Sequence, residues 1–200
     1  MNYLHPYCND QGQPVMILAP TTASTPLTWS APAEVATFVP CGDVPAQLNG
    51  IECAPARLPA ETQFPVPAPP MIPPHGLKPA AGAVILEPDG RLWLVTPTNH
   101  FGGYVHTFPK GRIESGGRPE ESAVREVFEE TGLVVVLTGW LGDFPRTTTY
   151  TRYFLAKRIG GTPANMGWES QAVHLVPRTQ LRALVQHPND QPILNALETT

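Results

Sequence analysis

The chain of 200 residues has little of three things that would define its class at once: cysteine, long apolar runs and surplus positive charge. Cys8, Cys41 and Cys53 form an odd set without a C-x-x-C pair, so neither a disulfide framework nor a zinc motif is indicated. No apolar run approaches the roughly 18 residues of a membrane-spanning helix, so we expect a soluble protein that does not act in a membrane. The net charge of −4, with neither half basic, argues against an extended nucleic-acid partner.

The first residues, MNYLHPYCNDQGQPV, lack the basic and apolar regions of a secretory signal. We therefore expect a cytoplasmic protein with reduced thiols. A chain of 200 residues is long enough for one domain with its own core, or for one domain and a sizeable extension.

Proline, in contrast, is abundant in the first part of the chain, where residues 1–80 hold 16 of the 25 prolines. Such density removes backbone donors and favours extended chain, so long helices are not expected there. The composition predicts a Pro-rich, β-rich or irregular extension over residues 1–79, with candidate strands at 15–19 (VMILA) and 34–39 (EVATFV). Residues 63–79 are expected to be a stiff linker or a strap lying on the next domain. Covering an active site, completing a substrate pocket and forming a homodimer all stay open as roles for the extension.

Residues 80–200 have the composition of one domain of mixed strands and helices. AGAVILEPDGRLWLVTP contains two apolar runs joined at Pro88-Asp89-Gly90, which predicts a hairpin. YVHTFPKG, LVVVLTGWLG, TTTYTRYFLAKR and QAVHLVP are further predicted strands, and RTQLRALVQH and QPILNALE are predicted closing helices. A central helix is expected to begin near Pro119 and to end at Gly132. Strands around a central helix indicate an α+β fold in which helices flank a mixed sheet.

The predicted central helix is amphipathic. Its apolar stripe consists of Ala123, Val124, Val127 and Phe128, and on the opposite side we expect Glu126, Glu129 and Glu130. Carboxylates three and four residues apart repel one another by a few tenths of a kcal/mol, about 0.2–0.5 per pair, unless something neutralises them. A hard cation such as Mg²⁺ would do so, since it binds a few carboxylates and keeps several waters. From the helix alone, a metal site and a solvated acidic face are both open interpretations.

The stretch GRIESGGRPEESAVREVFEETGL, residues 111–133, resembles the Nudix box, G-x5-E-x7-R-E-U-x-E-E-x-G-U, where U is a bulky aliphatic residue. The matching positions are Gly111, Arg125, Glu126, Val127, Glu129, Glu130, Gly132 and Leu133. One defined position departs, because Gly117 stands where the box has glutamate. The resemblance covers about residues 80–198 and implies a Nudix-like α/β/α sandwich with a mixed β-sheet.

The resemblance implies a Nudix hydrolase, which cleaves a pyrophosphate bond in a nucleoside diphosphate linked to another moiety. Its cofactor would be Mg²⁺ or Mn²⁺, with Glu126, Glu129 and Glu130 as the metal ligands and Arg125 orienting them. Its substrate would be a nucleotide or another diphosphate-containing small molecule, such as a dinucleoside polyphosphate or ADP-ribose.

The glycine at position 117, where the box has glutamate, has two consequences for the predicted site. In the family the missing glutamate usually pairs with the arginine that matches Arg125, so Glu114, Glu120 or Glu121 is needed as a substitute partner if the support is kept. The departure also motivates a rival hypothesis, a catalytically weak or inactive Nudix-fold module that senses a nucleotide and recruits a protein. The three remaining glutamates of the box favour the enzyme.

Residues outside the helix complete the predicted site. Glu169 precedes a predicted strand, where several Nudix branches place an acidic residue that acts as a base or as an additional metal ligand. The candidate catalytic residues are therefore Arg125, Glu129 and Glu169. The candidate substrate contacts are two residues that flank the first glycine of the box, an aromatic residue that could stack on a base, and an arginine on a later strand: Lys110, Arg112, Tyr104 and Arg152.

Overall fold

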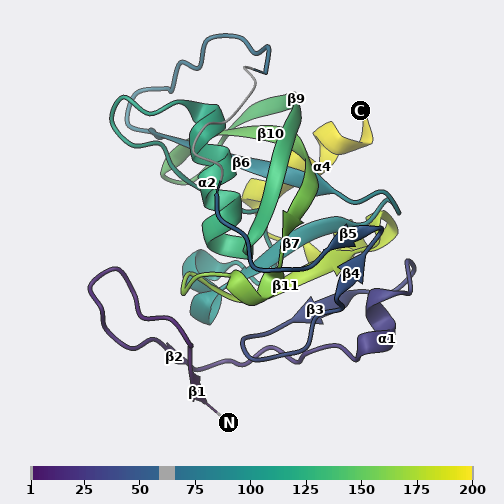
Figure 1. Cartoon of the computed structure of the whole chain (residues 1–200). Helices are drawn as coiled ribbons and strands as arrows, with labels where there is room; N and C mark the ends of the chain where they lie inside the picture. The colour runs from purple at the N-terminus through teal and green to yellow at the C-terminus, as the bar shows by residue number, and fades with distance from the viewer. Residues whose placement is uncertain (1, 59–65, 200) are drawn as a thin grey trace.

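The structure, a computed structural model, describes residues 2–58 and 66–199 (Figure 1). Its centre is a seven-stranded mixed sheet in the order β3–β11–β7–β6–β10–β9, with β8 paired to β6. The strands of this sheet are β3 (Ala36–Phe38), β6 (Lys78–Leu86), β7 (Leu92–Pro97), β8 (Lys110–Arg112), β9 (Leu133–Pro145), β10 (Thr149–Gly161) and β11 (Ser170–Val176). Among the described residues, β6 and β10 run parallel and the other neighbours in the sheet run antiparallel.

Helices cover both faces of the sheet. The helices are α2 (Pro119–Thr131), α3 (Leu181–Leu184) and α4 (Gln191–Glu198), and the short 3-10 turns are η1 (Thr98–Gly103), η2 (Pro163–Asn165), η3 (Arg178–Gln180) and η4 (Pro188–Asp190). In Figure 1, α2 lies on one side of β9 and α4 on the other. This arrangement confirms the predicted α+β class, in which a mixed sheet lies between helices.

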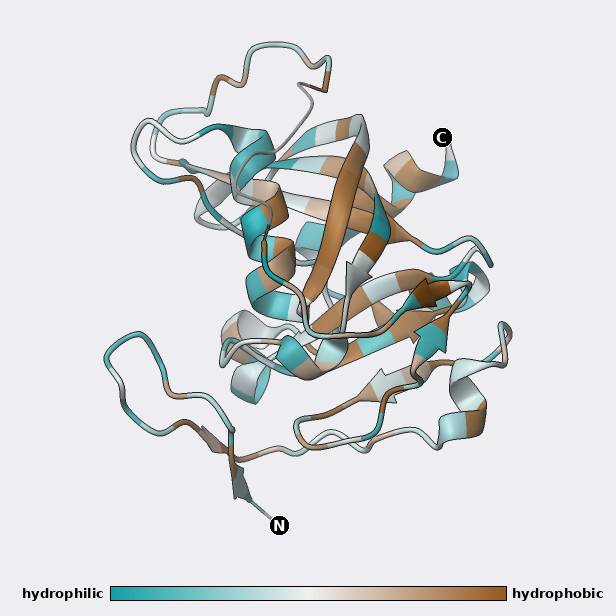
Figure 2. Cartoon of the chain, in the orientation of Figure 1, coloured by the Kyte–Doolittle hydropathy of each residue, from teal (hydrophilic) through white to brown (hydrophobic). Residues whose placement is uncertain are grey.

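Two apolar cores follow from the alternation of side chains along the strands. On β6, Ala83 and Ile85 face the core beneath α2, whereas Val84 between them faces the core beneath α3 and α4. Tyr153 and Phe154 on β10 divide between the two cores in the same way. In Figure 2 the strands are accordingly the most continuously apolar segments, whereas the N-terminal loop is mostly polar. No helix among residues 2–58 and 66–199 has the length and apolarity needed to cross a membrane.

The turn and capping residues in the sequence correctly predicted the ends of the central helix and the position of the hairpin. Pro119 is the first residue of α2, and Gly132 caps it in the left-handed conformation with φ of 71° and an N–H bond to the Phe128 carbonyl. A Cβ at Gly132 would also collide with the Thr162 carbonyl, so the position excludes larger residues on two grounds. At the hairpin, Gly90 has a φ of 84° and Leu86 pairs with Leu92, as the turn predicted.

The proline-rich extension is packed on the domain and contributes to its sheet. It contains the two-stranded pairs β1 (Tyr3–Leu4) with β2 (Met16–Ile17) and β4 (Gln47–Leu48) with β5 (Ile51–Glu52), and the short helix α1 (Pro26–Trp29). β3 lies beside β11 at the edge of the central sheet, so the predicted strand at 34–39 is confirmed. The strand predicted at 15–19 is confirmed as β2.

Buried arginines attach the extension at two points. Arg91 donates to the Trp29 carbonyl at 2.7 Å, and Arg158 donates to the Leu48 carbonyl at 2.9 Å. The predicted strap at 63–79 lies partly outside the described residues, at 63–65; its described part includes the Pro69 carbonyl, which accepts from Arg152 on β10 at 2.7 Å. The division at residue 80 stays a prediction, although β6 already begins at Lys78.

Candidate active site

Three carboxylates converge where α2 passes the start of β11. Glu126 and Glu130 come from α2 and Glu169 from the turn before β11, and one oxygen of each lies within 4.8 Å of the others. Glu126 and Glu130 are buried, whereas Glu169 reaches the surface. Oxygen ligands in a partly open arrangement fit a hard cation such as Mg²⁺, which keeps some of its own waters.

The position of these glutamates on α2 corrects the predicted helix faces. At about 100° per residue, Glu130 lies only about 20° from Ala123 and is thus a neighbour of the apolar stripe. Glu126 and Glu130 are 6% and 8% exposed, so the expectation that they lie on the face opposite the core was wrong. Glu129 points farther from the core, and its side chain is 52% exposed.

The backbone of β8 closes the cluster from the other side. The Lys110 N–H donates to Glu130 Oε2 at 2.9 Å, which fixes that carboxylate. Gly111 lies so close to Glu126 that a Cβ at this position would coincide with the Glu126 carboxyl group. The first glycine of the box is therefore required by the space that Glu126 occupies.

The surroundings of the cluster disfavour three negative charges. Burial, reinforced by the neighbouring carboxylates, raises the pKa of Glu130 to about 8 and that of Glu126 to about 7. The pKa of Glu169 is also raised, chiefly by loss of water around its carboxyl group. The positive charge of Lys110 opposes all three shifts, so its side chain lies near the cluster. A bound cation would relieve the repulsion that the protein's own residues leave uncompensated.

Arg125 bridges two of the glutamates of the box. Its Nη2 lies 2.9 Å from Glu126 Oε1, and its Nη1 lies 2.9 Å from Glu129 Oε2. The guanidinium is also anchored to the Arg112 carbonyl at 3.2 Å. This geometry supports the predicted orienting role of Arg125, whereas Glu129 is held in an ion pair and is not one of the three converging carboxylates.

Glu114 takes over part of the support that Gly117 cannot give. Its Oε1 lies 4.0 Å from Arg125 Nη2, whereas Glu120 and Glu121 lie near Arg118. The Glu114 side chain is 80% exposed, so this ion pair is weak.

Two predicted substrate contacts lie elsewhere. Tyr104 stacks on His187 with ring centroids 3.8 Å apart, and its hydroxyl accepts from Asn189 at 2.6 Å. Arg152 is buried, with Nε and Nη2 each 2.7 Å from the Asp143 carboxylate. Their polar groups are satisfied within the protein, so the structure brings neither to the carboxylate cluster.

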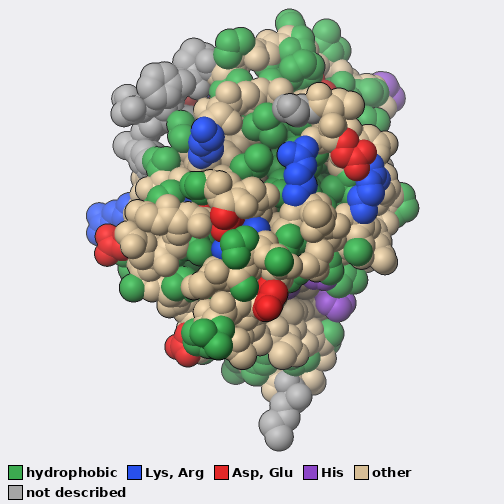
Figure 3. Space-filling model, turned by 90° about the vertical axis from the view of Figure 1, so that its right-hand side faces the viewer, with side chains coloured by type: hydrophobic (Ala, Val, Ile, Leu, Met, Phe, Trp, Pro, Cys, Tyr) green, Lys and Arg blue, Asp and Glu red, His purple; other side chains and the backbone are tan. Residues whose placement is uncertain are grey.

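The positive charges around β10 are mostly structural. Arg146 pairs with Asp190 at 2.7 Å and Arg158 pairs with Glu87 at 2.6 Å, all four side chains being buried. Arg112, by contrast, is exposed next to the cluster. On the face drawn in Figure 3, the described Lys and Arg side chains do not form one continuous patch, and several of them lie next to Asp or Glu side chains.

A separate cavity of about 370 Å³ lies between the loop after η1 and the residues that follow α3. Its lining includes Val105, His106, Leu184, Gln186 and His187, and none of the converging carboxylates belongs to it. The residues at the cluster that the sequence did not indicate are Asp10 and Trp168, which are hydrogen-bonded to each other beside Glu169. No local pattern links two positions so far apart in the chain.

Comparison with known proteins agrees with the box. The family described as NUDIX domain matches residues 76–197. An RNA pyrophosphohydrolase of Caulobacter vibrioides (strain NA1000 / CB15N) is 38% identical over 74 residues, which are 34% of this chain and 43% of that protein. An RNA pyrophosphohydrolase of Proteus mirabilis (strain HI4320) is 30% identical over 128 residues, 62% of this chain and 63% of that protein. The chain thus spans less than two thirds of the length of these curated relatives.

Solved structures share the fold. A putative nudix hydrolase family member from Chromobacterium violaceum matches with a TM-score of 0.50 and 23% identity, over 63% of this chain and 79% of that one. The MutT protein from Methanosarcina mazei Go1 matches with a TM-score of 0.50 and 15% identity, over 62% and 94%. At these identities the likeness concerns the fold alone, and it confirms the predicted sandwich.

Proposed function

Because the chain belongs to the Nudix family, we propose that it is a divalent-metal-dependent pyrophosphohydrolase that cleaves a nucleoside diphosphate linked to another moiety. The observation that carries this proposal is the convergence of Glu126, Glu130 and Glu169 within 4.8 Å, packed against Gly111 of β8. Three carboxylates with raised pKa values repel one another when ionised, and a divalent cation, which prefers oxygen ligands, would remove this repulsion.

Each group at the site has a proposed role. Glu126, Glu130 and Glu169 would hold Mg²⁺ or Mn²⁺, which when bound polarises phosphoryl oxygens and lowers the pKa of water. Arg125 orients Glu126, and Glu129 would join the ligands by leaving Arg125. Glu129 and Glu169 are the two carboxylates that reach solvent, and they are therefore the candidates for taking a proton from the attacking water.

The substrate class follows from the charge of the site and from the relatives. Lys110, whose charge acts on the cluster, and the exposed Arg112 are the proposed contacts for phosphate oxygens. The relatives' name adds the 5′ end of an RNA to the candidate substrates. The net charge of −4 favours contact with the diphosphate end over contact with a long nucleic-acid backbone.

The test is a steady-state assay with Mg²⁺ or Mn²⁺ on ADP-ribose, diadenosine polyphosphates, nucleotide sugars, NTPs and a short 5′-triphosphorylated RNA. We expect metal-dependent release of a nucleoside monophosphate, an RNA 5′-monophosphate or pyrophosphate from at least one of them. Folded protein that binds a nucleotide tightly with metal yet never hydrolyses it would favour the non-catalytic module. Homodimer formation and a cytoplasmic location stay predictions.

Gly117→Glu restores the glutamate that the Nudix box has at this position. It tests the rival hypothesis, a catalytically weak or inactive module, because that hypothesis is motivated by Gly117. A Cβ there would lie 3.1 Å from the Glu114 carbonyl oxygen, a tight contact that requires the loop to shift by a few tenths of an ångström. A further carboxylate near Arg125, beside those of Glu114, Glu126 and Glu129, should raise kcat a few-fold, as expected for an exposed ion pair worth up to about 1 kcal/mol. Gly117→Gln, of equal size and without charge, is the control, and an equal gain in both variants would show that charge is not the cause.

Gly111→Ala should have the opposite effect. Its Cβ would displace the Glu126 carboxylate, so we expect kcat and Mn²⁺ affinity each to fall by about tenfold or more, the range for misplaced ligands. Gly160→Ala, whose Cβ would meet nothing within 4 Å, is the matched control and should change neither value. Equal kinetics in the two variants would contradict the tight packing of Gly111 on Glu126.

A further inference from the structure

Glu169 lies at the start of β11, in a segment made of the turn residues 168 and 169 and the first two residues of the strand, here called the turn 168–171. The rest of the catalytic domain holds this segment from one side. The Thr98 N–H donates to the Glu169 carbonyl at 2.8 Å, and the Thr98 hydroxyl donates to the Trp168 carbonyl at 2.6 Å. Unlike Glu126 and Glu130, which α2 fixes, Glu169 is exposed and comes from a loop. Repulsion from two buried carboxylates would turn such a side chain outward unless its backbone is fixed.

The segment Tyr3–Thr21, here called the N-terminal arm, holds the same turn from the other side. The ring of His5 is buried, and its Nε2 lies 3.1 Å from the Ser170 carbonyl. The Tyr7 N–H donates to His5 Nδ1 at 3.0 Å, which leaves the proton on Nε2 and makes it the donor to Ser170.

Two more contacts of the arm flank Glu169. Trp168 Nε1 donates to the Asp10 carboxylate at 3.0 Å. On the other side, Gln171 Nε2 donates to the Ala19 carbonyl at 2.6 Å and to the Thr21 hydroxyl at 3.0 Å. Residues 168, 170 and 171 are therefore all hydrogen-bonded to the arm, so the neighbours of the exposed Glu169 on both sides in the chain are fixed.

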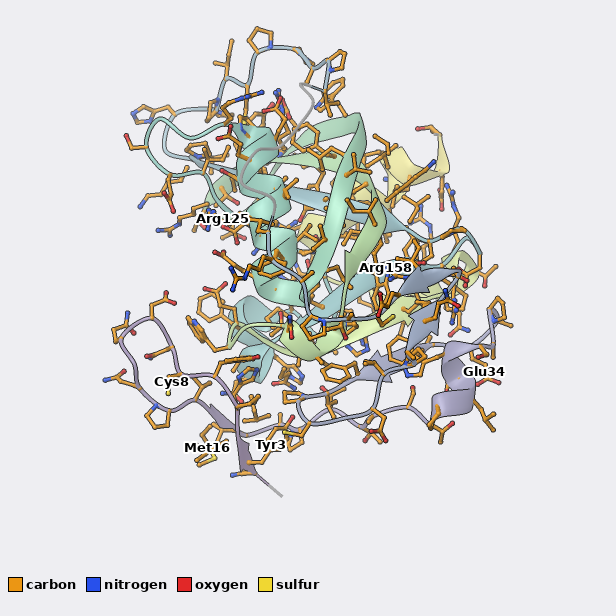
Figure 4. All side chains as sticks on the ribbon, in the orientation of Figure 1. Tyr3, Cys8, Met16, Glu34, Arg125 and Arg158 are labelled. Carbon is orange, nitrogen blue, oxygen red and sulfur yellow. The ribbon has the colours of Figure 1, made fainter. Side chains whose placement is uncertain are left out.

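The arm also fixes η1, from which Thr98 contacts the turn. Asn99 accepts from the Leu18 N–H at 2.7 Å and donates to the Met16 carbonyl at 2.8 Å. Its φ of 53° is in the left-handed region, which asparagine adopts more readily than most non-glycine residues. Figure 4 shows Cys8 in the loop of the arm, with Tyr3 and Met16 on the strands that close it.

We propose that the N-terminal arm is a positioning element of the active site, which fixes the turn 168–171 and thereby holds the Glu169 carboxylate against those of Glu126 and Glu130. The inference rests on the proposed function, because Glu169 matters to catalysis only if the cluster binds a metal. The arm lies outside residues 76–197, so it is an addition of this chain to the part that matches the family.

The test uses the full chain with His5→Leu and Asp10→Ala. We measure hydrogen exchange of the amides at 168–171 without metal, Mn²⁺ affinity by calorimetry, and kcat and KM. Losing one hydrogen bond should speed this exchange by about tenfold and weaken Mn²⁺ binding several-fold. We expect kcat to fall with KM unchanged. Asp10→Asn, which keeps an acceptor for Trp168, should restore wild-type values.

Gln180→Ala is the matched control. It removes another bond between the extension and the domain, from Gln180 Nε2 to the Ala33 carbonyl at 2.9 Å, and it should leave exchange at 168–171 and Mn²⁺ affinity unchanged. The arm's role is overturned if both test variants keep wild-type exchange and affinity, or if the control changes them equally. Wild-type protein that binds no Mn²⁺, while exchange still responds to His5→Leu, would instead refute the proposed function and the catalytic role of the turn with it. If His5→Leu does not fold, the exposed Asp10 still allows the test.

Discussion

Glu130→Gln is expected to abolish metal-dependent turnover, with kcat lowered by about a thousandfold, the scale of several kcal/mol of metal stabilisation. Glutamine has the same size and can still accept the N–H of Lys110, which Glu130 Oε2 accepts at 2.9 Å. What the substitution removes is the charge of a buried carboxylate at the centre of the cluster. Steady-state rates with Mg²⁺ and Mn²⁺ measure the loss, and a melting curve shows whether the fold persists.

The same substitution should stabilise the metal-free protein at alkaline pH. The pKa of Glu130 is about 8 in the folded protein, well above the 4.5 of a free side chain. Between these values the folded state binds more protons than the unfolded state, so its stability falls as the pH rises from about 4.5 to 8. Without that carboxyl group, the free energy of unfolding at pH 8 should exceed the wild-type value by roughly 2–4 kcal/mol and should equal it near pH 4.5.

Added Mg²⁺ should reverse the wild-type trend. A cation that binds the ionised carboxylates stabilises the folded state more at pH 8 than at pH 5.5. Glu130→Gln should weaken this dependence, and Glu126, whose pKa is also raised, should account for what is left. Glu121→Gln, in the exposed first turn of α2, is the control and should retain the turnover and the pH profile of wild type. Turnover within a few-fold of wild type in Glu130→Gln would remove this residue from the mechanism.

The parts of the fold that the sequence predicted correctly depend on short-range chemistry. Pro119 and Gly132 set the ends of α2 through their own backbone preferences, and Gly90 does the same for the hairpin. The spacing of the box also identified Glu126 and Glu130. Their burial was not foreseen, because Glu130 borders the apolar stripe and β8 packs against it only in the folded protein.

What the sequence could not predict depends on partners far away in the chain. Arg152 was a candidate substrate contact by its position on a strand, but it pairs with Asp143 on the neighbouring strand β9 and donates to the distant Pro69 carbonyl of the extension. On the same strand, Arg158 pairs with Glu87, which lies far from it in the chain. Likewise β3 joins the sheet beside β11, although its composition is that of the extension. The proline content predicts that the extension does not form long helices. It does not predict the surface on which the extension packs.

Arg158→Met should be the most destabilising of the substitutions considered, costing about 3–5 kcal/mol, because it leaves a buried carboxylate without its charge partner. Arg158 Nε lies 2.6 Å from Glu87 Oε1, and both side chains are fully buried. Glu87 would keep only the bonds from Trp93 and Asn49, each at 2.8 Å. Loss of the bond from Arg158 to Leu48 would also release the β4–β5 turn, so urea denaturation should show a lower midpoint. In Figure 4, Arg158 lies near β4 and β5, away from Arg125 on α2.

The charge argument can be separated from packing by the double variant Arg158→Met with Glu87→Gln. Glutamine keeps an acceptor for Trp93 and removes the unpaired charge, so the double variant should regain a substantial part of the lost stability. Arg182→Met breaks the exposed pair with Glu198 and should leave the urea midpoint nearly unchanged, because water screens this pair. If Arg158→Met were as mild as Arg182→Met, the buried Glu87 carboxylate would not need its charge partner.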